Sequence, residues 1–335
     1  MRNWQNQLKY NPIQPLLNSK DEALHYFVKR DLLEEKVGLI NSIWQLPEPQ
    51  KILKKQLNDG SWKYSGKPKE IYPKNHHFLV ETWKQFRFLI EKYEFTKEQP
   101  SIRRAAEFLF SFQTEEGDIR GMIANQYATY YTGAIMSLLI KAGYEDDPRI
   151  EKGFQWLLSM RQQDLGWTIP IITHKFDKAT QYKLTSEYLE PINPDRSKPF
   201  SHNWTGMVIR AFAAHKKYRK SEGAITAANL LKSKFFKKDY YTSYRAASYW
   251  VKFQFPFWWN NLVAALDSIS LIGISKEDPD IQNALNWFIN NQEKSGLWKL
   301  SYDKTKKQEI ENPKSKEMQL WISLVICRIF KRFFG

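Results

Sequence analysis

A short turn-like segment recurs along this chain of 335 residues, and it constrains the fold more than any other feature. The copies are QLNDGSW (56–62), QTEEGDI (113–119), RQQDLGW (161–167), KFFKKDY (234–240) and QEKSGLW (292–298). Three copies place Gln four residues before Gly, and every copy ends in a large apolar or aromatic residue. Self-similarity of this kind predicts a repeat architecture in which each turn closes one structural unit.

An amphipathic helix is predicted before each turn. Pro100, Pro148 and Pro279 each stand thirteen residues before the first position of a turn, and Ser221 takes the same place in the fourth copy. Asp precedes the second and third of these prolines, which is the order of a helix N-cap and a first helical residue. The first copy departs, because Pro49 stands only seven residues before its turn. Apolar spacing beyond these caps is helical, and the glycine turn stops each helix.

A second set of segments is apolar on most sides, which is typical of buried helices. These segments are 21–35, 76–92, 126–142, 202–217, 257–273 and 317–334. Because amphipathic and buried helices alternate, we predict an all-α fold, an α/α toroid of about five to six helical hairpins in two concentric rings. The segment 317–334 is expected to close the ring against the N-terminal segment, with a membrane-surface helix as the alternative.

We expect one domain over residues 1–335, with an excursion at 168–200. This segment lacks helical periodicity and holds four prolines within 33 residues, so we expect a long loop over one mouth of the toroid. Loops of this length in compact domains are often lids or binding loops. A passive surface insertion is the alternative.

The Gln-x3-Gly-x-Trp turns resemble the QW repeats of terpenoid cyclases such as squalene cyclase, and the related repeats of protein prenyltransferase β-subunits. The resemblance covers nearly the whole chain and implies the toroid fold, in which Gln and Trp tie an outer helix to its neighbour. The Asp-x-Asp-Asp motif and the Asp-rich magnesium motif of these enzymes are absent. Cys327, the only cysteine, lies in the last predicted helix, so the zinc site of the prenyltransferases cannot assemble. The resemblance therefore implies a fold and transfers no catalytic residue.

The predicted starts of the buried helices gather polar and aromatic residues. Because each turn leads into a buried helix, these helices should begin at one mouth of the toroid, where their dipoles favour an anion. The candidate ligand-binding residues there are His76, His77, Tyr130, Tyr131, His202, Asn203, Trp204, Trp258, Trp259 and Asn261. An apolar cavity with a few convergent polar groups is typical of a ligand site. The same side chains would otherwise pack the core or cap helices.

Glu81 and Asp267 are the candidate catalytic residues, because each is a carboxyl group inside a predicted buried helix. A buried carboxyl must be paired, hydrogen-bonded or protonated, and a protonated one is a possible general acid. A structural hydrogen bond to a neighbouring helix is the alternative. We expect no metal site and no cofactor, since no ligand-spaced pair accompanies the histidines.

The formal net charge of +15 arises from 51 Lys and Arg against 36 Asp and Glu. These residues are spread along the chain, which favours a solvated Lys-rich surface and makes a nucleic-acid partner unexpected. The N-terminus is polar and no apolar run has membrane-spanning length, so a cytoplasmic protein is expected, with peripheral membrane contact as an alternative.

Three functions remain open from the sequence. The first is an enzyme or binding protein whose aromatic-lined central cavity takes an isoprenoid or another apolar ligand, phosphorylated or not. The second is a carbohydrate-active α/α barrel, in which paired carboxyl groups do acid–base work. The third is a scaffold without catalysis that binds a protein partner. The pattern does not name the reaction or the oligomeric state.

Overall fold

The computed structural model describes residues 3–67, 75–241, 246–302 and 312–335. The chain forms two compact units: unit 1 comprises Met1–Leu39 and Arg219–Gly335, and unit 2 comprises Ile40–Tyr218. The all-α class is confirmed, because among the described residues the regular structure is helical apart from the four-residue strand β1. The expectation of a single domain stays a prediction.

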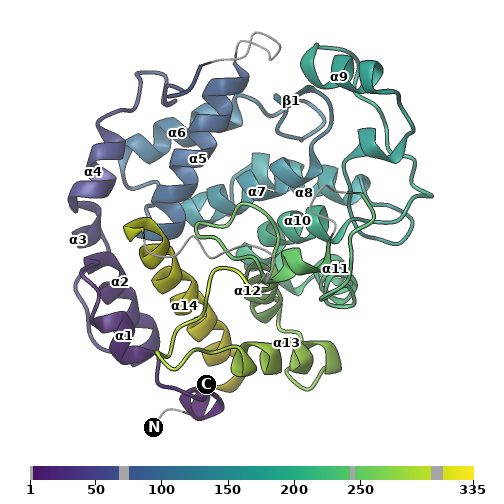
Figure 1. The fold of residues 1–335 in the computed structure, drawn as a ribbon. Helices are drawn as coiled ribbons and strands as arrows, with labels where there is room; N and C mark the ends of the chain where they lie inside the picture. Colours follow the sequence, from purple (N-terminus) through teal and green to yellow (C-terminus); the bar gives the residue numbers. More distant parts are fainter. Residues whose placement is uncertain (1–2, 68–74, 242–245, 303–311) are drawn as a thin grey trace. The chain divides into compact units, whose positions relative to one another are not determined.

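Unit 2 contains the helices from α3 to α10, which Figure 1 labels. Its elements are α3 (Asn41–Trp44), α4 (Pro47–Leu53), α5 (His76–Tyr93), α6 (Pro100–Phe110), β1 (Met122–Asn125), α7 (Thr129–Leu139), η3 (Ile140–Tyr144), α8 (Pro148–Ser159), η4 (Pro170–Thr173), α9 (Lys178–Ser186) and α10 (His202–Ala214). Every residue of α7 is buried, whereas α6 and α8 are amphipathic. This alternation matches the predicted pairing of an exposed helix with a buried one.

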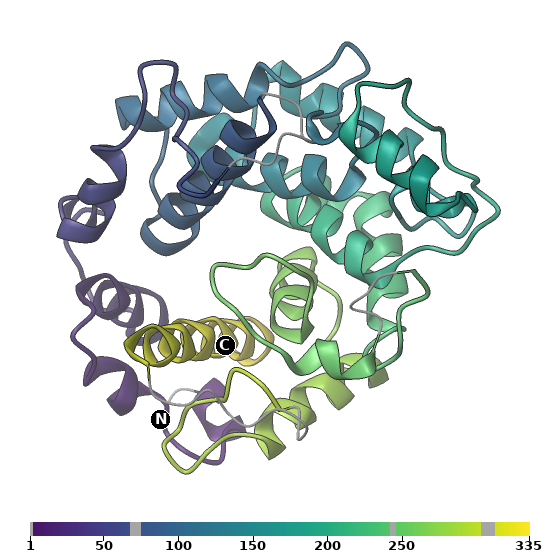
Figure 2. The ribbon, with the colours of Figure 1, turned by 45° about the horizontal axis from the view of Figure 1, so that its top comes forward.

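Unit 1 brings the two ends of the chain together. Its elements are η1 (Asn3–Gln7), α1 (Ile13–Leu17), α2 (Glu22–Phe27), η2 (Val28–Leu33), α11 (Glu222–Lys232), η6 (Ala247–Val251), α12 (Leu262–Ile272), α13 (Pro279–Asn290) and α14 (Pro313–Phe334). The C-terminal α14 packs against η1, α2 and α12, and Figure 2 shows it in yellow beside the purple N-terminal helices. The Trp321 indole N–H donates to Asp21 over 2.8 Å. The expected packing of the last helix on the N-terminal segment is therefore confirmed.

The predicted helix starts are confirmed at their caps. Asp147 accepts from the Arg149 N–H over 2.9 Å, and Asp278 accepts from the Asp280 N–H over 3.0 Å. Ser221 caps α11 in the same way. In each case a side-chain oxygen satisfies one of the backbone donors that the first helical turn leaves unpaired.

Several predicted boundaries are corrected by the tertiary structure. The buried helix expected over 257–273 begins only at Leu262, because Asn261 acts as its N-cap. The helix expected over 126–142 begins at Thr129, and the one over 202–217 ends at Ala214. The excursion also carries a nine-residue helix, α9, capped by Asp177. These differences sit at caps and short helices, where apolar periodicity is weakest.

In the first, second and fifth turns, the glutamine ties its own turn to a second segment. The Nε2 of Gln113 donates to the Gly117 carbonyl and to the Arg149 carbonyl, both over 2.8 Å. The Nε2 of Gln292 donates to the Gly296 and Tyr10 carbonyls over 2.9 and 2.8 Å. In the first case the second carbonyl belongs to the opening turn of the next amphipathic helix, α8. The turn glutamine is thus a structural tie between consecutive repeats.

The last residue of each turn is tied to the buried helix that follows. The backbone N–H groups of Trp62, Ile119, Trp167 and Trp298 donate to the hydroxyls of Thr82, Thr132, Thr205 and Ser323 over 3.1, 3.1, 2.9 and 3.2 Å, respectively. All four hydroxyl-bearing residues are fully buried. Because a buried N–H without a partner is costly, one Thr or Ser per repeat fixes how the turn seats on the helix.

The fourth turn departs from the others. Tyr240 was expected to take the place of the turn tryptophan, but its side chain is 68% exposed. The buried aromatic at this repeat is Trp250, whose indole N–H donates to the Lys237 carbonyl over 3.0 Å. The prediction for Tyr240 is wrong because a longer connection brings a later aromatic residue into that position.

We predict that Thr205→Val destabilises the protein by about 1–3 kcal/mol, because it leaves the buried N–H of Trp167 without its hydroxyl acceptor, whereas the Trp167 carbonyl keeps the Ser201 N–H. Thr205→Ser keeps the hydroxyl and should lose only about 1 kcal/mol. Urea unfolding of the three proteins measures this difference. Equal losses in both variants would contradict the proposed tie.

We also predict that Gly117→Ala is more damaging than Gly273→Ala. Both glycines have positive φ, +111° and +92°, so both changes carry backbone strain of about 1 kcal/mol or more. A Cβ at Gly117 would lie 2.6 Å from the Lys152 carbonyl oxygen, whereas one at Gly273 would meet no atom within 4 Å. The denaturant midpoint should therefore fall further in Gly117→Ala than in Gly273→Ala, because only the first variant adds a steric clash to the backbone strain.

Candidate ligand-binding site

Three buried helices of unit 2 bring four aromatic rings into one series. Trp83 of α5 meets Tyr131 of α7 edge-on with ring centroids 5.2 Å apart. Tyr131 lies 4.2 Å from Tyr130, which lies 4.5 Å from Trp204 of α10. All four side chains are buried. We call this series the aromatic band; it contains three of the candidate ligand-binding residues, Tyr130, Tyr131 and Trp204, together with Trp83.

A glycine allows the two helices that carry most of the band to approach closely. A Cβ at Gly133 of α7 would lie 2.6 Å from the Cα of Val208 in α10, so the two backbones are in contact there. The two helices lie side by side in Figures 1 and 2. Close approach at Gly133 sets the spacing at which the Tyr130 and Trp204 rings meet one turn earlier.

The phenol groups of the band are neutral. Burial raises the pKa of Tyr130 well above its ordinary value, and the neighbouring Tyr131 raises it further through charge repulsion and a hydrogen bond. A neutral phenol can donate a hydrogen bond while its ring face packs on apolar atoms. The band therefore offers an apolar surface with a small number of hydroxyl donors.

Arg87 lies next to the aromatic band, and Arg210 lies near enough to Arg87 to act on its charge. The Arg87 guanidinium carbon stands 4.8 Å from the centre of the Trp83 ring, one helical turn along α5. Burial and, after it, the positive charge of Arg210 on α10 together lower the pKa of Arg87 to about 10, against the opposing effects of Glu91 and Tyr131. The charges of the two guanidinium groups therefore act against one another, and the Glu91 carboxylate partly offsets this effect on Arg87.

His202 and Asn203 open α10 and are buried beside Trp204 in its first turn. His76 and His77 open α5, with ring centroids 5.2 Å apart. The Nδ1 of His76 is 3.2 Å from the Gly121 carbonyl, and His77 stacks on Tyr64 at 4.8 Å. Burial lowers the pKa of His76, so its imidazole is neutral near pH 7. His76 therefore contacts the turn that precedes β1, whereas His77 packs on Tyr64.

Glu81 is buried but is held on its own helix. The Gln85 amide donates to it over 2.5 Å, and Lys84 lies 3.4 Å away. Glu81 stands two residues from Trp83, about 200° around α5, so the two side chains leave the helix on different faces. The carboxylate is consequently not part of the aromatic band.

The candidates of unit 1 occupy different kinds of position. Trp258 and Trp259 are half-buried with ring centroids 5.8 Å apart, in the non-helical segment before α12. The side-chain oxygen of Asn261 accepts a hydrogen bond from the Ala264 N–H over 3.0 Å, so Asn261 is the N-cap of α12. Asp267 is half-buried and pairs with Arg332 of α14. This ion pair ties two helices together, which is the structural role considered for Asp267 from the sequence.

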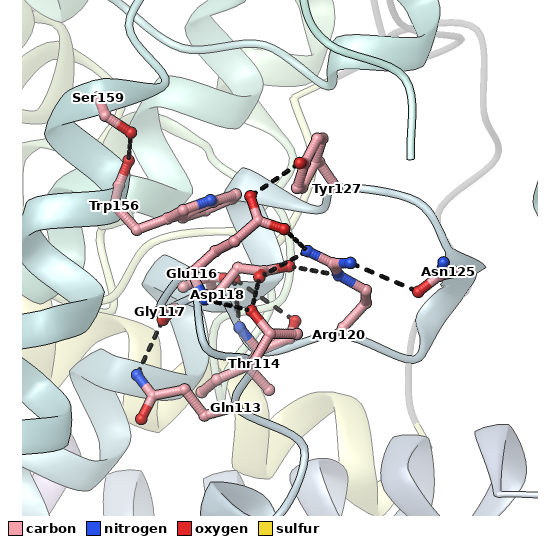
Figure 3. Close-up of polar contacts among 12 residues, drawn as sticks. Gln113, Thr114, Glu116, Gly117, Asp118, Arg120, Asn125, Tyr127, Trp156 and Ser159 are labelled. Atoms are coloured by element: carbon pink, nitrogen blue, oxygen red, sulfur yellow. Dashed lines mark hydrogen bonds and ion pairs between the residues drawn. The ribbon is translucent and has the colours of Figure 1, made fainter. Parts of the chain in front are cut away.

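A cluster that the sequence analysis did not single out lies on the second turn (Figure 3). Arg120 donates to Asp118 over 2.9 and 3.0 Å and to Glu116 over 2.8 Å. The Tyr127 hydroxyl donates to the second oxygen of Glu116 over 2.8 Å. We call these four residues the acid–arginine cluster. Asp118 is fully buried, so the guanidinium is needed to hold its charge inside the protein.

The electrostatics of the acid–arginine cluster agree with its geometry. Hydrogen bonds from Arg120 and Tyr127 lower the pKa of Glu116, although partial burial opposes them. Burial and the Glu116 carboxylate raise the pKa of Tyr127 to about 12. Arg120 also donates to the Asn125 side-chain oxygen over 3.5 Å, so the cluster contacts the last residue of β1.

The sequence offered a signal for Arg87 and Arg210 that was not used. Both are cations within predicted buried helices, and a charged residue in such a helix needs an explanation whatever its sign. The acid–arginine cluster had no comparable signal, because its members are ordinary turn residues until folding brings them together. In the described ranges, no group of three or more His, Cys, Asp or Glu side chains is placed to hold a metal ion.

No protein-family model matches this chain, and no curated protein matches it. Among solved structures, a protein from Actinoplanes is 12% identical, with 88% of this chain and 87% of that chain covered and a TM-score of 0.39. The type II terpene cyclase MstE from Scytonema is 15% identical, with 84% and 94% covered and a TM-score of 0.37. A variant of that cyclase in complex with geranylgeranyl dihydroxybenzoate is 13% identical, with the same coverage and a TM-score of 0.35. Likenesses at this level assign no activity to this chain.

The described residues include no helix that is both long enough and apolar enough to cross a membrane.

We predict that Arg120→Gln destabilises unit 2 by about 3 kcal/mol at pH 7, because it leaves the buried Asp118 charge uncompensated. The pH dependence should change as well. The folded pKa of Glu116 is lowered from 4.5, so its stabilisation is present above pH 4.5 and is lost as the pH falls through the folded pKa. Between pH 4.5 and the folded pKa of Glu116, the free energy of unfolding should therefore fall less in the variant than in the wild type. Urea unfolding at a series of pH values measures this difference.

Lys152→Gln is the matched control for this prediction. Its ion pair with Glu115 joins two exposed side chains over 3.0 Å, so its removal should cost well under about 1 kcal/mol. Similar losses of unfolding free energy in the two variants would show that burial of Asp118 does not make its pair with Arg120 more stabilising than an exposed pair.

Proposed function

We propose that unit 2 binds an elongated apolar ligand of the isoprenoid type through the aromatic band, with the anionic end of the ligand held by Arg87 and Arg210. The observation that carries the proposal is a run of aromatic rings across three helices that ends beside two mutually repelling guanidinium groups. Aromatic faces pack on the methyl groups and double bonds of an isoprenoid chain. Arginine binds phosphate and carboxylate groups in a bidentate manner.

The position of the cations refines the expectation drawn from helix dipoles. Arg87 and Arg210 lie eleven and eight residues after the first residues of α5 and α10, which is about two to three turns inside the helices. Under this proposal the charged end of the ligand lies along the helices beside the arginines rather than at the helix starts. The neutral His76 and the buried His202 are then apolar or hydrogen-bonding neighbours, not the main anion ligands.

A sugar-hydrolysing function receives less support from the same residues. That chemistry needs two carboxyl groups that face one glycosidic bond. Glu81 is held by Gln85 on its own helix, and Asp267 is held by Arg332. Both carboxylates already serve a structural contact, so the proposal concerns ligand binding by the aromatic band.

The test is a comparison of geranylgeranyl diphosphate with geranylgeraniol, measured by calorimetry and by quenching of tryptophan fluorescence. We expect the diphosphate to bind more tightly, and Arg210→Gln to weaken it about tenfold or more while the alcohol is little affected. Arg103→Gln, an exposed arginine of α6, is the control. Equal affinities for the two compounds, or an unchanged diphosphate affinity in Arg210→Gln, would refute the proposal.

The thermal stability of the ligand-free protein is an independent test of the role of the two arginines. A lowered folded pKa means that charged Arg87 costs stability at every pH below about 10, and this cost shrinks when the pH rises through that value. Arg210→Gln removes one source of the repulsion, so the melting temperature of the ligand-free protein should rise or stay constant. A gain in stability with a loss of affinity is typical of a binding residue.

A further inference from the structure

The excursion begins and ends in a neck, residues 167–174 and 193–201, that is pinned by buried hydrogen bonds. The Ser201 N–H donates to the Trp167 carbonyl over 3.0 Å, and the Thr129 hydroxyl of α7 donates to the Thr168 carbonyl over 2.8 Å. Trp167, Thr168 and Ser201 are buried. Buried and paired backbone of this kind opens only at a high free-energy cost.

A second level of contacts holds the two sides of the neck together. The Asp195 N–H donates to the Thr173 hydroxyl, and His174 Nε2 lies against the Asn193 carbonyl, both at 2.8 Å. The buried turn residue Gln162 donates its amide to the carbonyls of Asp195 and Lys198 over 2.8 and 3.0 Å. The neck is therefore fastened to the third repeat turn by the same type of glutamine contact that joins the repeats.

The tip of the excursion, residues 175–192, is held in a different manner. It contains α9, of which only Leu184 is buried. The aromatic side chains of Tyr182 and Tyr188 are 53% and 62% exposed. With nine residues, α9 is also too short to persist as an isolated helix in water, so its order depends on contact with the rest of unit 2.

Two amide side chains at the end of β1 make the main polar contacts with the tip. Gln126 donates to the Glu190 carbonyl over 3.1 Å and accepts from the Ile192 N–H over 2.9 Å. Asn125 donates to the Leu189 carbonyl over 3.0 Å. We call Asn125 and Gln126 the clasp. Gln126 is almost fully buried, so its two bonds form away from bulk water.

The clasp is itself positioned by the acid–arginine cluster. Asn125 uses its amide nitrogen on the tip while its oxygen faces Arg120 at 3.5 Å. Arg120 is fixed by Glu116 and Asp118, as Figure 3 shows. Because the amide of Asn125 cannot turn over without placing its NH₂ group against the guanidinium, the cluster selects the orientation that donates to the tip.

The place of the neck relates the tip to the aromatic band. Thr129, which pins the neck, immediately precedes Tyr130, and Ser201 is the N-cap of the helix that carries Trp204. The rigid end of the excursion therefore adjoins the starts of α7 and α10, and the weakly held end reaches across to β1.

We propose that residues 175–192 form a flap that hinges on the pinned neck, is kept closed by Asn125 and Gln126, and admits ligand to the aromatic band when the clasp opens. The gating role rests on the proposed function, whereas the flap motion is a property of the excursion alone. The physical cause is the contrast between a neck of buried hydrogen bonds and a tip held by two amides and one leucine.

Hydrogen exchange on the ligand-free protein tests the flap. The readout is the amides of α9, whose hydrogen bonds do not involve the clasp directly. We expect α9 to exchange faster than the neck in the wild type, and Gln126→Ala to accelerate α9 by roughly tenfold to a hundredfold with the neck unchanged, since two buried hydrogen bonds are lost. Asn125→Ala, which removes one bond, should give a smaller acceleration and serves if Gln126→Ala does not fold.

Gln163→Ala is the matched control, because its side chain is exposed and its backbone bond to Arg196 survives the change. A common exchange rate for α9 and the neck in the wild type would overturn the flap. Unchanged α9 exchange in both clasp variants would overturn it as well.

Stopped-flow binding of geranylgeranyl diphosphate tests the gating role. In Gln126→Ala we expect the association rate to rise severalfold, as a larger fraction of molecules is open. An unchanged rate would overturn gating. If the wild type does not bind this probe, the proposed function fails and gating fails with it, while the exchange gradient still decides whether the flap exists.

Discussion

The structure depends on one recurring constraint, which is that the backbone at the end of each repeat turn is buried and must still form its hydrogen bonds. A Thr or Ser hydroxyl from the following buried helix accepts the N–H of the last turn residue in four repeats. The turn glutamine satisfies carbonyls on the other side. Since an unpaired buried backbone group costs about 1–3 kcal/mol, these contacts leave little freedom in how each turn seats on its helix.

The candidate site follows from that seating. Thr205 binds Trp167 at the start of α10, and Thr132 binds Ile119 on α7, so the two helices are anchored at their first turns. Gly133 then lets their backbones meet at Val208. The rings of Tyr130 and Trp204 are brought together as a result, and Arg210 is carried toward Arg87. A structural rule of the repeat thus produces a chemical feature that the repeat itself does not encode.

Sequence periodicity predicted the helices and their caps well, because both depend on residues within a few positions of one another. Asp147, Ser221 and Asp278 cap the helices that they were expected to cap. The same method failed at Tyr240, where the buried position went to Trp250 ten residues later. It also placed Asn261 among ligand-binding residues, although its side chain caps α12.

The candidate site was predicted in part. Tyr130, Tyr131 and Trp204 meet as expected, since each stands near the start of a buried helix. Trp83, Arg87 and Arg210 were missed, because they stand deeper in their helices and only the packing of α7 against both α5 and α10 brings these helices together. The acid–arginine cluster and the clasp join residues from a turn, a strand and the excursion, and no short-range pattern links those segments.

The sequence by itself determined which segments are helical, which caps start the amphipathic helices, which helix faces are apolar and where the repeat turns stand. These features follow from local hydrogen bonding and from the period of the α-helix. The tertiary structure alone decided which side chains face each other: the hydroxyl under each turn, the arginine beside each carboxylate and the amides that hold the excursion. Such pairs join residues far apart in the sequence, as Gln126 and Ile192 do across 66 positions, and only the folded chain brings them within hydrogen-bonding distance.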